Sequence, residues 1–191
     1  MVPRGMDTNT TERWLTTTVG ALTLGLAVAV VAVYAWGRSI PEQQSATASA
    51  EFAVAPQRIW EVLGDPARRS DWRPRVDRVG RIDDDAEGRP VWRELAHDED
   101  RFDFRIDARE PGRRITIAIA APDQIGIAGG WDYRIEPSSA GSRLSVTETR
   151  RIANPLWRGM FHLRRDSHAT VDQELDMLAN FLGTEIRIEH R

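Results

Sequence analysis

Three side chains in the middle of the sequence have types and spacing that suggest chemistry: Glu94, Tyr133 and Glu148. Each glutamate alternates with apolar residues, and a carboxylate that pointed inward would have a raised pKa and become an acid or base candidate. Because charged side chains are rarely buried, we expect both glutamates at the rim of a pocket or outside it. Tyr133 is the best candidate for a polar group inside a pocket, since a buried phenol normally finds a hydrogen-bond partner.

Other reactive constellations are missing from the sequence. The chain has no cysteine, which excludes disulfides, thiolate metal sites and cysteine nucleophiles. The histidines near the C-terminus lack the spacing of a helical metal site, so no metal is expected. No Gly-x-Ser-x-Gly motif and no phosphate-binding glycine loop occurs. We therefore name no catalytic residue, favour a non-enzymatic role, and expect no cofactor other than a bound lipid or quinone.

Aromatic side chains are concentrated in the same region. Core packing is the simpler explanation for any single one, but as a set on one concave face they suit a flat, apolar guest. The predicted ligand-binding residues are Trp60, Trp72, Trp92, Phe102, Phe104, Ile117, Trp131, Tyr133, Met160 and Leu163.

The charge pattern gives no sign of nucleic-acid binding. The formal net charge is −3, and all 26 basic residues are arginines. A group of them lies among aspartates at Arg68, Arg69, Arg73, Arg75 and Arg78. We interpret this group as solvated surface, with contact to anionic lipid head groups as the alternative.

A membrane span is the clearest signal in the sequence. The stretch from Trp14 to Trp36 holds no charged residue over about 23 positions, roughly 34 Å as a helix, which matches a bilayer core of about 30 Å. Trp14, Tyr34 and Trp36 lie where interfacial aromatic belts occur. A cleaved signal peptide is the alternative, but the apolar run exceeds the about 7 to 15 residues typical of one.

The span predicts a single-pass protein of the cell (inner) membrane. Arginines near its two ends almost balance, so the positive-inside rule leaves the side of the remaining chain undecided. Ala21, Gly25 and Ala29 form a small-residue line that permits close packing of another membrane helix. An alanine-rich span also produces such lines by chance, and we favour that interpretation.

The pattern divides the chain into five parts. We expect an N-terminal tail at 1–13 and a transmembrane helix at 14–36. Residues 1–5 resemble the remnant of an affinity tag, with an authentic start of the protein as the alternative. A linker at 37–45, a folded domain at 46–183 and a C-terminal tail at 184–191 follow.

The folded part predicts an α+β fold. One strand, two short helices and about six further strands precede a single long amphipathic helix from Asn154 to Gly183. Asn-Pro is a favourable helix start, and glycine a favourable end. Short turns favour an antiparallel meander, and the long helix is the only element available to cover it. We expect a curved sheet of about seven strands around that helix.

Several short motifs resemble one family. In chain order they are Trp60, Gly64-Asp65-Pro66, Trp72-Arg73-Pro74, Gly88-Arg89-Pro90-Val91-Trp92-Arg93-Glu94, Glu110-Pro111-Gly112 and Gly129-Gly130-Trp131-Asp132-Tyr133. Over about residues 46–183 this order resembles the START-like (SRPBCC) superfamily of polyketide cyclase/dehydrase and lipid-transport proteins. The resemblance implies the helix-grip fold with a deep apolar cavity between sheet and C-terminal helix. The superfamily includes lipid carriers, quinone-binding chaperones, hormone receptors and cyclases, so the fold alone does not select an activity.

These observations support one leading hypothesis and two alternatives. The leading hypothesis is a membrane-anchored START-like domain that binds a hydrophobic small molecule at the membrane surface, with membrane lipids as partners and no nucleic acid. The first alternative is an accessory or structural subunit of a larger membrane complex, which contacts other subunits through the transmembrane helix. The second is a polyketide-type cyclase or dehydratase.

Overall fold

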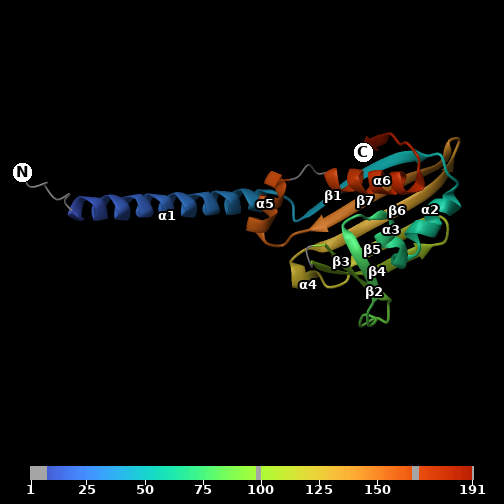
Figure 1. The fold of residues 1–191 in the computed structure, drawn as a ribbon, viewed down its shortest axis with the longest axis horizontal. Helices are drawn as coiled ribbons and strands as arrows, with labels where there is room; N and C mark the ends of the chain where they lie inside the picture. The colour runs from blue at the N-terminus through green and yellow to red at the C-terminus, as the bar shows by residue number, and fades with distance from the viewer. Residues whose placement is uncertain (1–7, 98–99, 165–167, 191) are drawn as a thin grey trace, which may run out of the picture. The chain divides into compact units, whose positions relative to one another are not determined.

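The computed structural model describes residues 8–97, 100–164 and 168–190 (Figure 1). The chain forms two compact units. One combines the N-terminal segment up to Pro41 with Asn154–Leu163, and the other combines Glu42–Ala153 with the segment that starts at Arg164.

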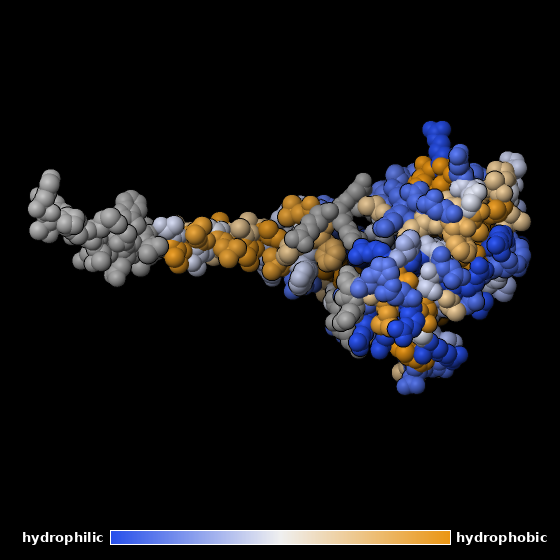
Figure 2. Space-filling model, viewed as in Figure 1, coloured by the Kyte–Doolittle hydropathy of each residue, from blue (hydrophilic) through white to orange (hydrophobic). Residues whose placement is uncertain are grey.

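The first unit contains the long helix α1, Thr8–Ser39. Among the described residues, Thr18–Ser39 of this helix is the one helical segment that is long and apolar enough to cross a membrane. The most apolar stretch of this segment is not buried by the rest of the protein. Figure 2 shows hydrophobic residues along this segment without a covering layer. By length and composition it fits a membrane anchor or a signal sequence. Ala21, Gly25 and Ala29 are exposed on it, and their role in helix packing stays a prediction.

A second helix, α5, Pro155–Arg164, completes the first unit. The Asn154 side-chain oxygen accepts hydrogen bonds from the backbone N–H groups of Leu156 at 2.9 Å and Trp157 at 3.4 Å. Pro155 occupies the first helical position, where its missing N–H costs nothing. The start predicted from the Asn-Pro pair is therefore confirmed. In Figure 1, α5 lies across the C-terminal end of α1.

The second unit is built on one eight-stranded antiparallel sheet in the order β2-β3-β4-β5-β6-β7-β1-β8. The strands are β1 Gln43–Phe52, β2 Val76–Arg81, β3 Val91–Ala96, β4 Arg101–Glu110, β5 Arg114–Ile119, β6 Ala128–Ser138, β7 Gly141–Arg151 and β8 Ile188–His190. The meander from β2 to β7 follows the chain, as expected from the short turns. β8 pairs with β1 inside the segment expected as a tail, and β1 begins inside the expected linker.

Short helices fill the connections. α2 Pro56–Leu63, the 3-10 turn η1 Pro66–Arg68 and α3 Arg69–Trp72 link β1 to β2, and α4 Pro122–Ile125 links β5 to β6. The Asp65 side chain caps the turn by accepting from the Ala67 N–H at 3.0 Å. The Gly64-Asp65-Pro66 motif thus separates α2 from α3, and the two short helices expected after the first strand are present.

Helix α6, Ala169–Leu182, packs on the concave face of the sheet against β1 and β7. Val171, Leu175 and Leu178 on its inner side are fully buried, and Gly183 ends the helix at a φ of 66°. The expectation of one continuous helix from Asn154 to Gly183 is wrong. The stretch forms two helices, α5 and α6, and residues 165–167 between them lie outside the described part of the chain.

The core lies between the sheet and α6. Alternate strand residues point into it, which explains the period-two pattern of the sequence. Its strand members include Phe52, Phe104, Ile115, Ile117, Tyr133, Ile135, Leu144 and Val146. This core fills much of the space under α6.

Candidate ligand-binding site

A cavity of about 340 Å³ opens in the second unit between α6 and the strands β3, β4 and β6. This volume is close to the lower limit of ligand pockets, about 300 to 1,000 Å³. Its lining comprises Arg73, Arg75, Val76, Glu94, Ala96, Asp100, Phe102, Phe104, Trp131, Thr170, Gln173, Glu174 and Met177. The cavity is thus smaller and more polar than the deep apolar pocket expected, because Trp72, Trp92 and Tyr133 occupy the interior beside it.

Glu94 on β3 anchors the polar side of this cavity. The carboxylate accepts a hydrogen bond from the Arg69 guanidinium of α3 and another from the Trp92 indole N–H at 3.2 Å. Arg73 Nη1 lies 3.5 Å from its second oxygen. Glu94 and Arg69 are both almost fully buried, so each charge depends on the other for compensation.

Glu174 lies on the opposite wall of the cavity, formed by α6, and belongs to the same network of charged and hydrogen-bonded side chains as Glu94. It projects from α6, is 2 % exposed, and accepts a hydrogen bond from the Tyr133 hydroxyl of β6. Arg73 Nη2 lies 3.2 Å from Glu174 Oε2, but not in hydrogen-bonding geometry. Arg73 therefore bridges a carboxylate of the sheet and a carboxylate of the covering helix.

Burial and pairing set the protonation states of this network. Burial raises the pKa of Tyr133 well above its usual value, and the Glu174 carboxylate raises it further. For Arg69, burial alone lowers the pKa, but Glu94 and the other facing groups outweigh it and raise the pKa above its ordinary value. At neutral pH the phenol is a neutral donor and the guanidinium a cation.

Some buried donors in this region have no hydrogen-bond acceptor among the residues that the structure describes. They are Nη1 and Nη2 of Arg69 and the indole N–H groups of Trp72 and Trp131. The guanidinium of Arg69 instead lies 5.7 to 6.0 Å from the ring centres of Trp72, Trp92 and Phe104, in cation–π range. Trp131 lines the cavity, so an acceptor on a guest is one way to satisfy its indole N–H.

The structure brings together only part of the predicted ligand-binding set. Phe102, Phe104 and Trp131 line the cavity, while Trp72, Trp92, Ile117 and Tyr133 are buried in the core. Trp60 packs against the core under the Arg109 guanidinium, 5.2 Å from its ring centre. Met160 and Leu163 belong to α5 in the first unit.

The expectation that both glutamates lie at the rim or outside is wrong. Glu94 is 4 % exposed and Glu148 is 8 % exposed. Glu148 accepts from Arg150 at 2.9 Å on the same strand and is not among the cavity residues. Only Glu94 therefore belongs to the candidate site.

Among the residues that sequence reasoning missed are three charged members of the network around the cavity: Arg69, Arg73 and Glu174. The first two were assigned to a solvated surface, yet Arg69 is 1 % exposed. Glu174 was not named as a candidate residue. A usable signal existed for it, because Val171, Glu174, Leu175 and Leu178 follow the i, i+3, i+4, i+7 spacing of one helical face.

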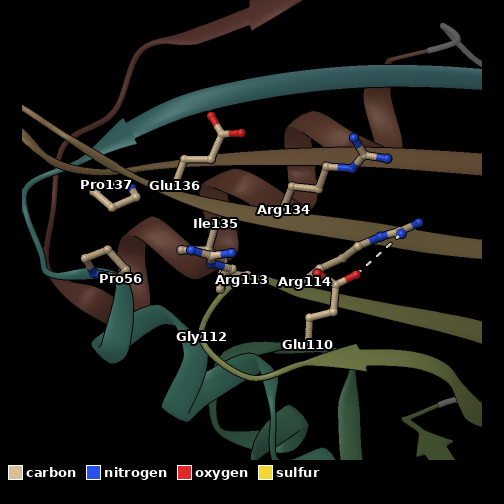
Figure 3. A pocket seen from close by; sticks show the side chains of 9 residues that line it. All are labelled: Pro56, Glu110, Gly112, Arg113, Arg114, Arg134, Ile135, Glu136 and Pro137. Carbon is tan, nitrogen blue, oxygen red and sulfur yellow. Dashed lines mark ion pairs between the residues drawn. The ribbon is translucent and has the colours of Figure 1, made fainter.

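A second hollow of about 540 Å³ lies elsewhere in this unit, where the β4–β5 turn meets β6 and the start of α2. Figure 3 shows its charged side chains, with Arg114 paired to Glu110, and the guanidinium groups spread outward. Asp132 on β6, outside the hollow, accepts from Arg114 and Arg134. These paired charges around an open groove do not provide the enclosed apolar walls of a small-molecule site. Among the described residues no cluster of His, Asp or Glu is arranged to hold a metal ion.

Comparison with protein families matches residues 43–183 to the model for polyketide cyclase / dehydrase and lipid transport. The chain belongs to this family. The match includes every strand of the sheet except β8, together with α6, and it agrees with the START-like resemblance of the sequence motifs. A search of the curated proteins gave no match.

Solved structures share the fold at low sequence identity. Truncated norcoclaurine synthase from Thalictrum flavum has a TM-score of 0.56 at 11 % identity, covering 73 % of this chain and 93 % of that chain. A protein from Mesorhizobium loti has a TM-score of 0.54 at 12 % identity, covering 73 % and 97 %. Ara h 8.0201 has a TM-score of 0.51 at 13 % identity, covering 73 % and 99 %. At such identities these likenesses establish the fold and not the activity.

Proposed function

We propose that this protein is a membrane-anchored START-like domain that holds a small amphipathic molecule in the cavity under α6. The observation that carries the proposal is the make-up of the walls. Phe102, Phe104 and Met177 offer apolar surface, whereas Glu94, Arg73 and Glu174 form a charged side. Such a pocket favours a guest with an apolar body and one polar end, the latter placed against the charges.

The anchor part of the proposal rests on α1. Leu22, Leu24 and Leu26 are 67–70 % exposed, and an apolar helix of this length gains free energy when it enters a bilayer core. A domain held at a bilayer is close to a source of amphipathic molecules. We therefore propose that the guest enters the cavity from the surrounding membrane lipids.

The test is retention of a guest by the full-length protein purified in detergent. Ala96 lines the cavity, so Ala96→Trp fills it from the sheet side, and Met177→Trp fills it from α6. Ala86→Trp, on the exposed turn between β2 and β3, is the matched control. Native mass spectrometry and solvent extraction identify what each variant retains, and circular dichroism checks that each one is folded.

We expect wild type and Ala86→Trp to carry the same small molecule, and both filled variants to lose at least about tenfold of it, equivalent to about 1.4 kcal/mol of binding free energy. Retention that is equal in all four proteins, or no guest in wild type, contradicts the proposal. The location of α1 is tested separately by its protection from protease in reconstituted vesicles.

A further inference from the structure

Helix α5 exposes large apolar side chains that no part of the described chain covers. Trp157 is 56 % exposed and Leu163 is 64 % exposed, while Leu156, Met160 and Phe161 are only half-buried. A ten-residue helix with this much uncovered apolar surface indicates that something else covers it in the functional state.

Two glycines fix α5 on the end of α1. A Cβ atom on Gly37 would lie 1.8 Å from the Pro155 carbonyl oxygen, and one on Gly159 would lie 2.8 Å from the Val33 carbonyl oxygen. Ordinary side chains do not fit at either position. The two helix backbones therefore cross at a distance that only glycine permits, as in closely packed membrane helices.

A buried arginine reinforces the same crossing. Arg158 of α5 is 5 % exposed, and its Nε donates a hydrogen bond to the Gly37 carbonyl oxygen at 2.8 Å. That oxygen is among the last carbonyls of α1, which have no partner within the helix and which favour a nearby cation. Beside it, the Trp36 ring meets the His162 ring edge-on at 5.4 Å. These contacts define how α5 sits on α1.

The crossing lies at the end of the apolar span. The span runs from Thr18 to Ser39, so Gly37 is within its last turn. Tyr34 and Trp36 on the same turns are 44 % and 39 % exposed. Aromatic side chains at the end of a membrane helix typically lie at the level of the lipid head groups. Helix α5 packs on these turns and lies across the end of α1 (Figure 1), so the apolar face that it exposes is near this level of the span.

We propose that α5 is an interfacial membrane helix, whose exposed face lies in the boundary between head groups and acyl chains of the bilayer that α1 spans. This inference rests on the proposed function only in requiring α1 to be a membrane helix. The occupant is the bilayer because α5 packs on the last turns of the uncovered apolar span and exposes apolar side chains of its own there. In this arrangement the chain meets the bilayer at two separate places in the sequence, before β1 and between β7 and α6.

The absence of cysteine permits a direct test. Single cysteines are introduced as Trp157→Cys and Leu163→Cys in the full-length protein, labelled with an environment-sensitive fluorophore, and reconstituted in phosphatidylcholine/phosphatidylglycerol vesicles. Leu22→Cys, within the span, reports the acyl-chain region, and Ala86→Cys reports water. Quenching is measured with a nitroxide near the lipid head group, with a nitroxide near the end of the acyl chain, and with aqueous iodide.

We expect labels at positions 157 and 163 to be quenched most by the head-group nitroxide, the label at 22 by the acyl-chain nitroxide, and the label at 86 by iodide alone. If 157 and 163 behave like 86 while 22 remains in lipid, the inference is overturned and the anchor stands. Protection of 157 and 163 from every quencher identifies a protein partner or a second copy and also overturns it. A label at 22 that iodide quenches overturns the anchor itself.

Discussion

The hydroxyl of Tyr133 on β6 donates a hydrogen bond to the carboxylate of Glu174 on α6, with both groups buried in the second unit. This contact joins the sheet to the helix that covers the cavity. The donor is neutral and the acceptor is buried. The main energetic effect of losing the contact is therefore that the Glu174 carboxylate stays buried without its hydrogen-bond donor. The same pair links the stability of the fold to one wall of the candidate site.

Removal of this hydroxyl tests the contact. Tyr133→Phe deprives the buried Glu174 carboxylate of its donor, and we expect the free energy of unfolding to fall by about 1–3 kcal/mol. Urea denaturation of the full-length protein in detergent, followed by circular dichroism, measures the change. Tyr34, the other tyrosine, is 44 % exposed on α1, so Tyr34→Phe is the matched control and should change stability little. Equal effects of the two substitutions would show that the buried contact contributes nothing.

The pH dependence of stability gives a second test of the same phenol. Burial and the nearby Glu174 carboxylate raise the pKa of Tyr133 above 10 in the folded protein. In the unfolded chain the pKa of a tyrosine is about 10. Above that pH the unfolded state loses a proton that the folded state keeps, so this stabilisation is complete below pH about 10 and is lost at about 1.4 kcal/mol per pH unit up to the folded pKa.

The sequence makes this measurement unusually clean, because the chain has no lysine or cysteine to titrate in the same range. Unfolding free energies at a series of pH values from 9 to about 12 should show the decline in wild type and in Tyr34→Phe. Tyr133→Phe should show a shallower decline. A decline of the same slope in Tyr133→Phe rules out Tyr133 as its source.

The sequence predicted the sheet well and the site poorly, for physical reasons. Strand alternation is a local consequence of burying one face, so positions such as Ile115 and Ile117 reveal it directly. Pairing between charged residues is not local. Glu94 is buried because Arg69 and Arg73 reach it from another element, and residue type alone predicted all three at the surface.

The sequence pattern also failed to predict that α5 and α6 are separate helices. Apolar residues at helical spacing continue on both sides of the break, and no proline or glycine stands between Arg164 and Ala169. Helix α5 packs on α1 through Gly37 and Gly159, a contact between segments that are far apart in the sequence. Such contacts override local helix propensity. The hydrophobic pattern cannot report them.

The buried ion pair of the site should be far more costly to break than a surface pair on the same strand. Arg69→Met leaves the Glu94 carboxylate buried with the Trp92 hydrogen bond and the longer Arg73 contact, so we expect a loss of about 3–5 kcal/mol. Arg93→Met removes the pair with Asp103, whose N–O distance is 2.6 Å but whose arginine is 38 % exposed, and should lower the stability far less, because solvent screens exposed ion pairs. Urea denaturation of both variants measures the difference.

Adding Glu94→Gln to Arg69→Met separates loss of packing from loss of charge compensation. If the uncompensated carboxylate causes most of the cost, the double variant recovers at least about 1 kcal/mol relative to Arg69→Met alone. A double variant as unstable as the sum of its single substitutions would assign the cost to packing of the guanidinium against Trp72 and Trp92 instead.

Gly130 on β6 should tolerate no side chain, because the sheet closes tightly at this position. A Cβ atom there would lie 1.9 Å from the Ile117 carbonyl oxygen on the neighbouring β5, and this contact is with backbone that cannot rotate away. Gly130→Ala must therefore separate two paired strands beside Trp131, and we expect a loss of at least about 3 kcal/mol or a failure to fold. Gly80→Ala on β2 is the matched control, since its Cβ meets no atom within 4 Å. Thermal unfolding of both variants decides the matter: a Gly130→Ala protein as stable as Gly80→Ala would mean that β5 and β6 do not pair in this register.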